Sequence, residues 1–184
     1  MMNVLKYPPI KYSLKKIPDN LVYYSHKNKH YHDFMMSTTT KPFSTCYAYC
    51  NKGNYYNNEG YFPSLLVYMI KSNPQGSGLG SKMLDVMSNF SKKQGCEGRF
   101  HLFSTTQFSP NRIPHIFYRK YGMSTGYAQI DKKLDKFIKM GKPATCEDFD
   151  SILMHYSPSM QHNKKQKLTI FERVKKFLHI GNIK

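Results

Sequence analysis

Residues 64–94 constrain the fold more than any other stretch, because a strand pattern, a glycine-rich loop and a helix pattern follow one another directly. Residues 64–70 are almost continuously apolar, which predicts a strand buried on both faces. Residues 72–80 are rich in Gly, Ser, Asn and Pro and predict a loop. Residues 81–94 carry apolar side chains at helical spacing, and Gly95 stands where such a helix would end.

The glycine loop predicts an anion-binding site at the start of this helix. Backbone N–H groups at a helix start have no intrahelical partner, and the positive end of the helix dipole adds to their attraction for anions. Gly76, Gly78 and Gly80 allow a phosphate to come close, because they have no Cβ to block the approach. The spacing fits neither a Walker loop nor a Rossmann fingerprint.

The segments around this stretch continue the alternation of strands and helices. Strand patterns, turn patterns and a helix pattern stopped by Gly122 are found in this order: strand 43–49, turns 51–54 and 57–60, strand 99–106, helix 113–121 and strand 123–130. These patterns predict one domain of mixed strands and helices.

Two motifs in this region resemble those of a known family. Gln75-x-x-Gly78-x-Gly80 resembles the Arg/Gln-x-x-Gly-x-Gly/Ala signature of the GNAT superfamily of N-acetyltransferases. Residues 117–123, Phe-Tyr-Arg-Lys-Tyr-Gly-Met, resemble the family's Phe-Tyr-x-x-x-Gly-Phe segment. Asn111 precedes Tyr118 by seven residues, as a CoA-contacting Asn does in the family. The resemblance spans residues 64–127.

The sequence departs from the family pattern at two of these positions. Pro114 stands where the family has a small helical residue, so the helix is expected to begin late. Gln75 replaces the commoner Arg, which removes one positive charge and keeps the backbone donors.

The resemblance implies an α/β (α+β) fold of the GNAT type, with a mixed, mostly antiparallel central sheet flanked by helices. It also implies an N-acetyltransferase that moves an acetyl group from acetyl-CoA to a primary amine, with no metal. The residues that would bind the cofactor are Met69, Ile70, Gln75, Gly76, Ser77, Gly78, Leu79, Gly80, Ser81 and Asn111.

Catalytic roles follow from the same resemblance. Tyr118 is the candidate general acid, because its phenol can donate a proton to the departing CoA thiolate. Two residues remain open as the general base: Glu59, just before the central strand, and His101, on the next predicted strand.

The formal net charge of +17 predicts an anionic partner. The amine substrate is therefore expected on a macromolecular or anionic molecule, either a protein or an aminoacyl-tRNA. The alternative is a non-catalytic basic module that binds nucleic acid, for which residues 23–27, Tyr-Tyr-Ser-His-Lys, could stack bases.

Three regions are expected along the chain. Residues 1–42 form a basic N-terminal segment that is partly within the domain, and residues 43–160 form the acetyltransferase-like domain. Residues 161–184 form a basic linker and an amphipathic helix, whose apolar stripe could dock on its own domain, on a partner or on an anionic surface.

The chain is expected to be cytoplasmic, with export into a host cell left open. Its longest strongly apolar run, residues 65–70, is far shorter than the ~20 residues of a membrane span. The four cysteines are scattered, unlike those of a small disulfide-bonded domain. Cys46 and Cys50 form one loose pair, so a zinc site is not favoured and buried thiols on a strand are expected.

Overall fold

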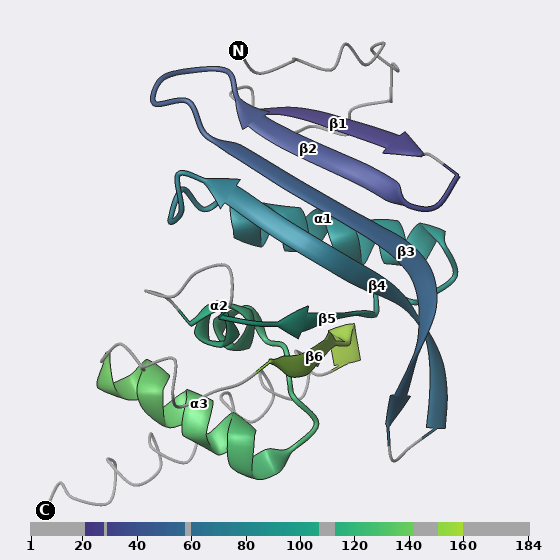
Figure 1. The fold of residues 1–184 in the computed structure, drawn as a ribbon, viewed down its shortest axis with the longest axis vertical. Coiled ribbons are helices and arrows are strands. Elements are labelled where there is room, and N and C mark those ends of the chain that lie inside the picture. The colour runs from purple at the N-terminus through teal and green to yellow at the C-terminus, as the bar shows by residue number, and fades with distance from the viewer. Residues whose placement is uncertain (1–20, 28, 58–59, 107–112, 142–150, 160–184) are drawn as a thin grey trace, which may run out of the picture.

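The computed structural model of the chain describes residues 21–27, 29–57, 60–106, 113–141 and 151–159. These residues form one six-stranded sheet and three helices (Figure 1). The strands are β1 Leu21–Lys27, β2 His32–Thr38, β3 Thr45–Asn57, β4 Gly60–Asn73, β5 Phe100–Ser104 and β6 Ile152–Tyr156. The helices are α1 Leu79–Lys93, α2 Pro114–Tyr121 and α3 Ala128–Met140.

The strands lie in the sheet in the order in which they occur in the chain. Every neighbouring pair is antiparallel except β4 and β5, which are parallel and joined by α1. The expectation of a mixed, mostly antiparallel sheet flanked by helices is confirmed. Only two register pairs join β4 to β5, Leu65 with Phe100 and Leu66 with His101, although both strands continue beyond them. The two strands therefore separate toward their carboxyl ends, and the glycine loop follows directly after the carboxyl end of β4.

One face of the sheet packs against α1, and β3 and β4 pass in front of this helix in Figure 1. The Phe90 ring of α1 lies 5.0 Å from the Phe34 ring of β2, measured between centroids. Fully buried side chains of α1, β4 and β5 fill the space between them, with Leu65, Met83, Met87 and Phe100 each at 0% exposure. The apolar spacing of residues 81–94 therefore points into the core, as the sequence predicted.

The helix predictions are confirmed with small shifts. α1 begins two residues earlier than expected, with Gly78 as its N-cap. α2 begins with Pro114 in its first turn and ends at Gly122, whose φ of 113° is a left-handed conformation that glycine adopts easily. A proline suits the first helical turn, because its missing N–H would have no intrahelical partner there.

Two secondary-structure predictions are wrong. Residues 51–54 are not a turn, because β3 runs through them and pairs with β4 as far as Asn57 with Gly60. Residues 123–130 form only a single bridge, between Ser124 and His155, before α3 begins. The Asp131 carboxylate accepts hydrogen bonds from the Ser124 hydroxyl and from Thr125, and these bonds fix a turn that the residue pattern did not reveal.

Strand β4 is buried on both faces only in part. Leu65 and Val67 are buried, whereas Tyr68 and Met69 are 52% and 38% exposed. The expected burial on both faces is therefore wrong for the second half of the strand. Strands β1, β2 and β6 were not predicted, and the first two place residues 21–27 and 32–38 in the sheet.

Several expectations lie outside the described residues, namely Glu59, Asn111 and the C-terminal segment 161–184. Within the described part, no helix is both long and apolar enough to cross a membrane. The same residues contain no group of three or more potential metal ligands. Cys46 and Cys50 are fully buried thiols on β3, and burial raises their pKa values to about 11 and about 12.

Candidate functional site

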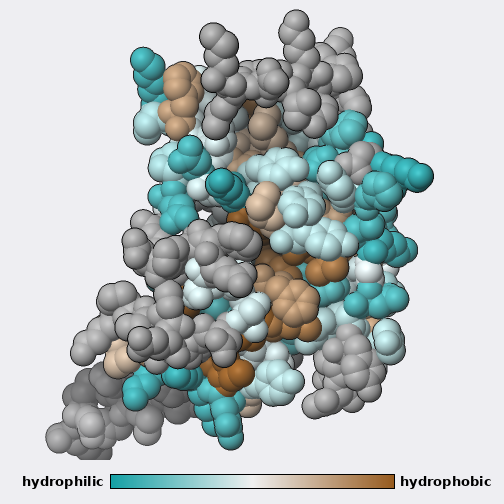
Figure 2. All heavy atoms as spheres, in the orientation of Figure 1, coloured by the Kyte–Doolittle hydropathy of each residue, from teal (hydrophilic) through white to brown (hydrophobic). Residues whose placement is uncertain are grey.

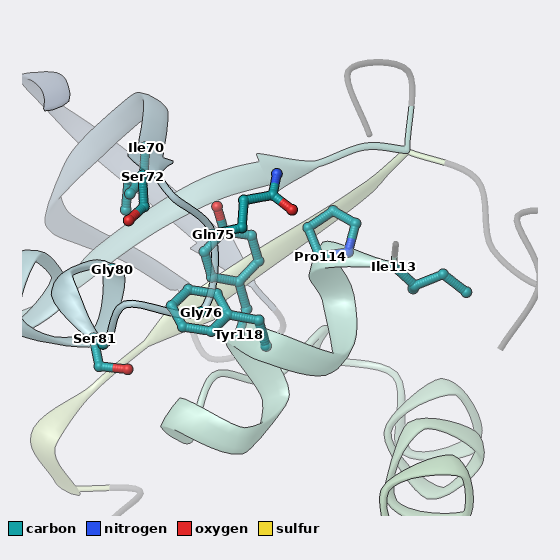
Figure 3. Close-up of a pocket in the computed structure, with 11 residues that line it drawn as sticks. Ile70, Ser72, Gln75, Gly76, Gly80, Ser81, Ile113, Pro114 and Tyr118 are labelled. Atoms are coloured by element: carbon teal, nitrogen blue, oxygen red, sulfur yellow. The ribbon is translucent and has the colours of Figure 1, made fainter. Parts of the chain in front are cut away.

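A pocket of about 420 Å³ lies where β4, the glycine loop and α2 meet (Figure 3). This volume falls within the ~300–1,000 Å³ that is typical of small-molecule sites. The residues that line it are Ile70, Ser72, Gln75, Gly76, Gly78, Gly80, Ser81, Ile113, Pro114, Phe117 and Tyr118.

The glycine loop forms the polar wall of the pocket. Gly76 and Gly78 have φ values of 85° and 80°, which are left-handed conformations, and a Cβ on either would meet no atom within 4 Å. The space beside both residues is therefore open to a ligand. Leu79 follows with its side chain buried at 2% exposure, which anchors the loop to the core.

The start of α1 provides hydrogen-bond donors without an acidic side chain in its first turn. Gly78 caps the helix in a left-handed conformation and makes no side-chain hydrogen bond. The first turn of α1 contains no acidic residue, although Asp and Glu are the usual side chains at this position. The N–H groups of this turn and the positive end of the helix dipole therefore remain available to an anion.

Gly80 lets α1 and α2 approach each other. A Cβ built at Gly80 would lie 3.1 Å from Cζ of Phe117, which is closer than ordinary contacts allow. Gly80 thus serves packing between the helices, whereas Gly76 and Gly78 leave open space. The Phe117 ring also lies 5.1 Å from the Tyr118 ring in an edge-to-face contact, so it joins the loop to the tyrosine.

The β4 wall depends on an irregularity in the sheet. The register between β3 and β4 shifts so that Tyr49 pairs with Met69 while Cys50 pairs with Val67, which leaves Tyr68 as an extra residue. A bulge of this kind bends a strand and changes the direction of the side chains that follow. Ile70 and Ser72 then share one side of the strand and line the pocket.

Tyr118 reaches the pocket from α2 and is 8% exposed. Burial, with the nearby Cys46 thiol as a smaller cause, raises the pKa of Tyr118 to about 12. The phenol therefore keeps its proton throughout the physiological pH range and is in the form that can donate it. Cys46 is fully buried on β3 and Tyr118 belongs to the same buried core cluster. Tyr118 therefore packs against the core and also lines the pocket.

Helix α2 is held in place from both sides. Arg119 forms ion pairs with Asp131 at 2.9 Å and Asp135 at 2.8 Å, both on α3. On the other side, the Tyr121 hydroxyl donates a 2.7 Å hydrogen bond to the Asp85 carboxylate of α1. These contacts fix the position of Tyr118 relative to the glycine loop, because Arg119 and Tyr121 follow it closely on the same helix.

The structure brings most of the sequence-predicted site residues together. Those that line the pocket are Ile70, Gln75, Gly76, Gly78, Gly80, Ser81 and Tyr118. Three others lie beside it without lining it: Ser77 is hydrogen-bonded to Ser72 at 3.1 Å, Leu79 is buried, and Met69 pairs with Tyr49. Asn111 and Glu59 fall outside the described residues.

His101 does not line the pocket with Tyr118. Its Nδ1 atom is 2.9 Å from the Ser64 hydroxyl oxygen, and its ring packs 5.6 Å from the Tyr55 ring. Burial, followed by the nearby His155, lowers the pKa of His101 to about 4. A histidine in this environment is neutral at physiological pH but is a weak base. Its low pKa and its absence from the pocket lining both argue against the expected role of His101 as the general base.

Four lining residues were not among the predicted site residues: Ser72, Ile113, Pro114 and Phe117. The spacing contained a signal for three of them. On one helix, Pro114 lies three residues before Phe117 and four before Tyr118, which places it on the same face as each of them. Ser72 lies two residues after Ile70 on a strand, so the period of two would have found it.

No known family model matches the chain, and no curated protein matches it. Among solved structures, the fold is similar to that in the KacTA–DNA complex, with TM-score 0.45, 13% identity and 77% of each chain covered. It is also similar to the AtaT toxin bound to the C-terminus of the antitoxin AtaR and acetyl-CoA, with TM-score 0.45 and 10% identity. That match covers 78% of this chain and 97% of the other. At these values the similarities identify neither the family nor the function of this chain.

Proposed function

We propose that the chain is an acyltransferase of the GNAT type, which moves an acetyl group from acetyl-CoA to a primary amine. One observation carries this proposal: the open glycine loop at the start of α1 and the protonated phenol of Tyr118 border the same pocket. An anion site and a proton donor are two of the features that serve transfer from a phosphate-bearing thioester.

The residues present fit the proposed co-substrate. Its pyrophosphate would take the polar wall, where Gly76 and Gly78 leave open space and the first turn of α1 carries no acid. The apolar side chains of Ile70, Ile113 and Phe117 line the same pocket and suit an uncharged arm. When bound, acetyl-CoA would supply the activated acyl group.

In this proposal Tyr118 acts as the general acid. The amine attacks the thioester carbonyl carbon, the carbon–sulfur bond breaks, and the Tyr118 hydroxyl donates its proton to the departing sulfur. The attacking amine must lose a proton, and no described residue in the pocket is a carboxylate or a histidine. Glu59 remains a candidate base outside the described residues.

The charge of the chain suggests the class of amine substrate. The described carboxylates all contact a partner within the protein: Asp33, Asp85, Glu97, Asp131 and Asp135. A small cationic amine would find little to hold it in a field of this sign. An amine carried by a protein or by an aminoacyl-tRNA fits the net charge of +17 better.

A charge placed at the first turn of α1 tests the proposal. Ser81 is exposed in this turn and lines the pocket, so Ser81→Asp puts a carboxylate where the phosphates should lie. An acid here is favourable for the helix itself, by ~0.3–1 kcal/mol, so the variant should fold at least as well as the wild type. Asn89→Asp is the matched control, because it adds the same charge at an exposed position of the same helix, ~12 Å away along the axis.

Isothermal titration with acetyl-CoA gives the result. We expect the wild type and Asn89→Asp to bind with similar affinity and Ser81→Asp to bind at least tenfold more weakly, because like charges repel in a partly enclosed pocket. The proposal fails if the wild type does not bind acetyl-CoA, or if both variants bind as tightly as the wild type.

A further inference from the structure

A group of tyrosines lies on the sheet face opposite α1. The rings of Tyr31 and Tyr49 are 5.4 Å apart, and those of Tyr49 and Tyr68 are 5.5 Å apart and nearly parallel, at 15°. Tyr47 lies beside them, 6.1 Å from Tyr49. These four residues are called the tyrosine platform below. Figure 2 looks onto this face, where pale rings and brown apolar side chains lie over the strands with teal hydrophilic side chains around them.

The strand alternation explains why these rings face outward. Tyr47 and Tyr49 alternate along β3 with Cys46, Ala48 and Cys50, which are fully buried on the side of α1. The tyrosines must therefore point to the opposite face. Tyr68 is the extra residue of the bulge in β4, and its ring stacks on Tyr49 while remaining 52% exposed. The ring surface turned away from Tyr49 is consequently accessible to a ligand.

The charges around the platform are mainly positive. The Asp33 carboxylate lies beside the platform: it accepts a 2.6 Å hydrogen bond from the Tyr47 hydroxyl and lies 3.7 Å from the Nδ1 atom of His26. Lys71 is exposed and pairs with Tyr47 across the β3–β4 ladder, so both side chains share this face. Lys29 is also exposed, two residues before Tyr31.

We propose that the tyrosine platform binds single-stranded nucleic acid, with bases stacked on the rings and phosphates near Lys29 and Lys71. Exposed aromatic rings on an open antiparallel sheet are suited to unpaired bases, because each base presents a flat π surface. Lysines at the margin and a net charge of +17 favour a polyanion over a neutral partner. The platform is separate from the proposed acetyl-CoA site, since Ile70 lines the pocket whereas Tyr68 stacks on the opposite face.

Fluorescence anisotropy with labelled oligouridylate and oligothymidylate of about 12 nucleotides tests the proposal. We expect Tyr31→Ala and Tyr68→Ala each to weaken binding by roughly fivefold to 100-fold, because each removes one stacking surface. Tyr68→Phe keeps the ring and should bind within about twofold of the wild type. The matched control is Tyr61→Ala, a change to a tyrosine on β4 that is 74% exposed and outside the platform. It should bind as the wild type does.

A salt series separates stacking from charge. Lys71→Gln should lower the slope of log affinity against log salt by about 0.7, the value for one phosphate contact on a single strand. Tyr31→Ala should leave this slope unchanged and should also leave acetyl-CoA binding unchanged, so failure of this proposal is distinct from failure of the acetyltransferase proposal.

Three results would overturn the proposal. The first is a wild type that binds neither oligonucleotide at low salt. The second is equal loss of affinity in Tyr61→Ala and in the two platform alanine variants, which would mean that binding depends on charge or general folding. The third is self-association that Tyr68→Ala abolishes, seen by sedimentation without oligonucleotide binding, which would make this face a contact between protein copies.

Discussion

Replacing Gly78 by alanine should weaken acetyl-CoA binding more than it weakens the fold. Gly78 has a φ of 80°, and an added Cβ would point into open space within the pocket. The left-handed conformation costs an L-residue ~1–2 kcal/mol, and reduced freedom of the unfolded chain offsets ~0.4–1 kcal/mol of this. The net loss of stability is therefore about 1 kcal/mol, which lowers Tm by ~2–4 °C in a chain of this size.

Gly95→Ala is the matched control for backbone strain. Gly95 has a φ of 76°, and its added Cβ would likewise meet nothing within 4 Å, but Gly95 follows the other end of α1. Both variants should therefore show the same small decrease in Tm by differential scanning fluorimetry. Only Gly78→Ala places a methyl group where a phosphate must approach the backbone donors.

The two variants should differ in affinity. Loss of one hydrogen bond to a charged group costs ~1.5–3 kcal/mol, which corresponds to about a tenfold to 100-fold weaker Kd. We expect this loss in Gly78→Ala by isothermal titration below both Tm values, and a change within about twofold in Gly95→Ala. Equal affinities in the two variants, with equal losses of Tm, would refute the assignment of the phosphate site to the glycine loop.

Three further predictions concern the proton donor, a buried histidine and the support of α2. Tyr118→Phe should lower kcat by ~10²–10⁴-fold in a thiol-release assay and leave acetyl-CoA binding nearly unchanged; full activity would exclude Tyr118 as the acid. In the folded chain the pKa of His101 is lowered from 6.5 to about 4, so as the pH falls His101 binds a proton in the unfolded chain before it does so in the folded chain. The free energy of unfolding should thus decrease between these pH values by up to ~3 kcal/mol in urea titrations, and His101→Gln should flatten this dependence. Arg119→Met leaves Asp131 and Asp135 without their cation and should cost ~2–3 kcal/mol, after allowance for the 41% exposure of Asp135; a loss below ~1 kcal/mol would contradict this.

The region predicted well from the sequence is the one whose elements depend on local signals. The glycine loop, the apolar spacing of α1 and the Gly122 stop of α2 each act within a few residues, so the pattern was sufficient to find them. The resemblance to the GNAT motifs, rather than these local patterns, assigned the glycine loop and Tyr118 to one proposed site, and both line one pocket in the structure.

The errors occurred where distant segments decide the local structure. Residues 51–54 have the composition of a turn, yet pairing with β4 extends β3 through them. The error at residues 123–130 has a nearer cause, because the Asp131 carboxylate in the first turn of α3 accepts hydrogen bonds from Ser124 and Thr125 and holds a turn there. No short-range pattern identifies Tyr68 as the extra residue of a bulge, because the bulge exists only relative to β3.

The contact between Gly80 and Phe117 links two positions that are far apart in the sequence. A Cβ at position 80 would lie 3.1 Å from the end of the Phe117 ring, so the volume available to one residue depends on the other. Among diverging relatives of this chain, alanine at position 80 should therefore accompany a shorter side chain at position 117. Such paired changes would keep the helix spacing constant while the surface presented to the ligand evolves.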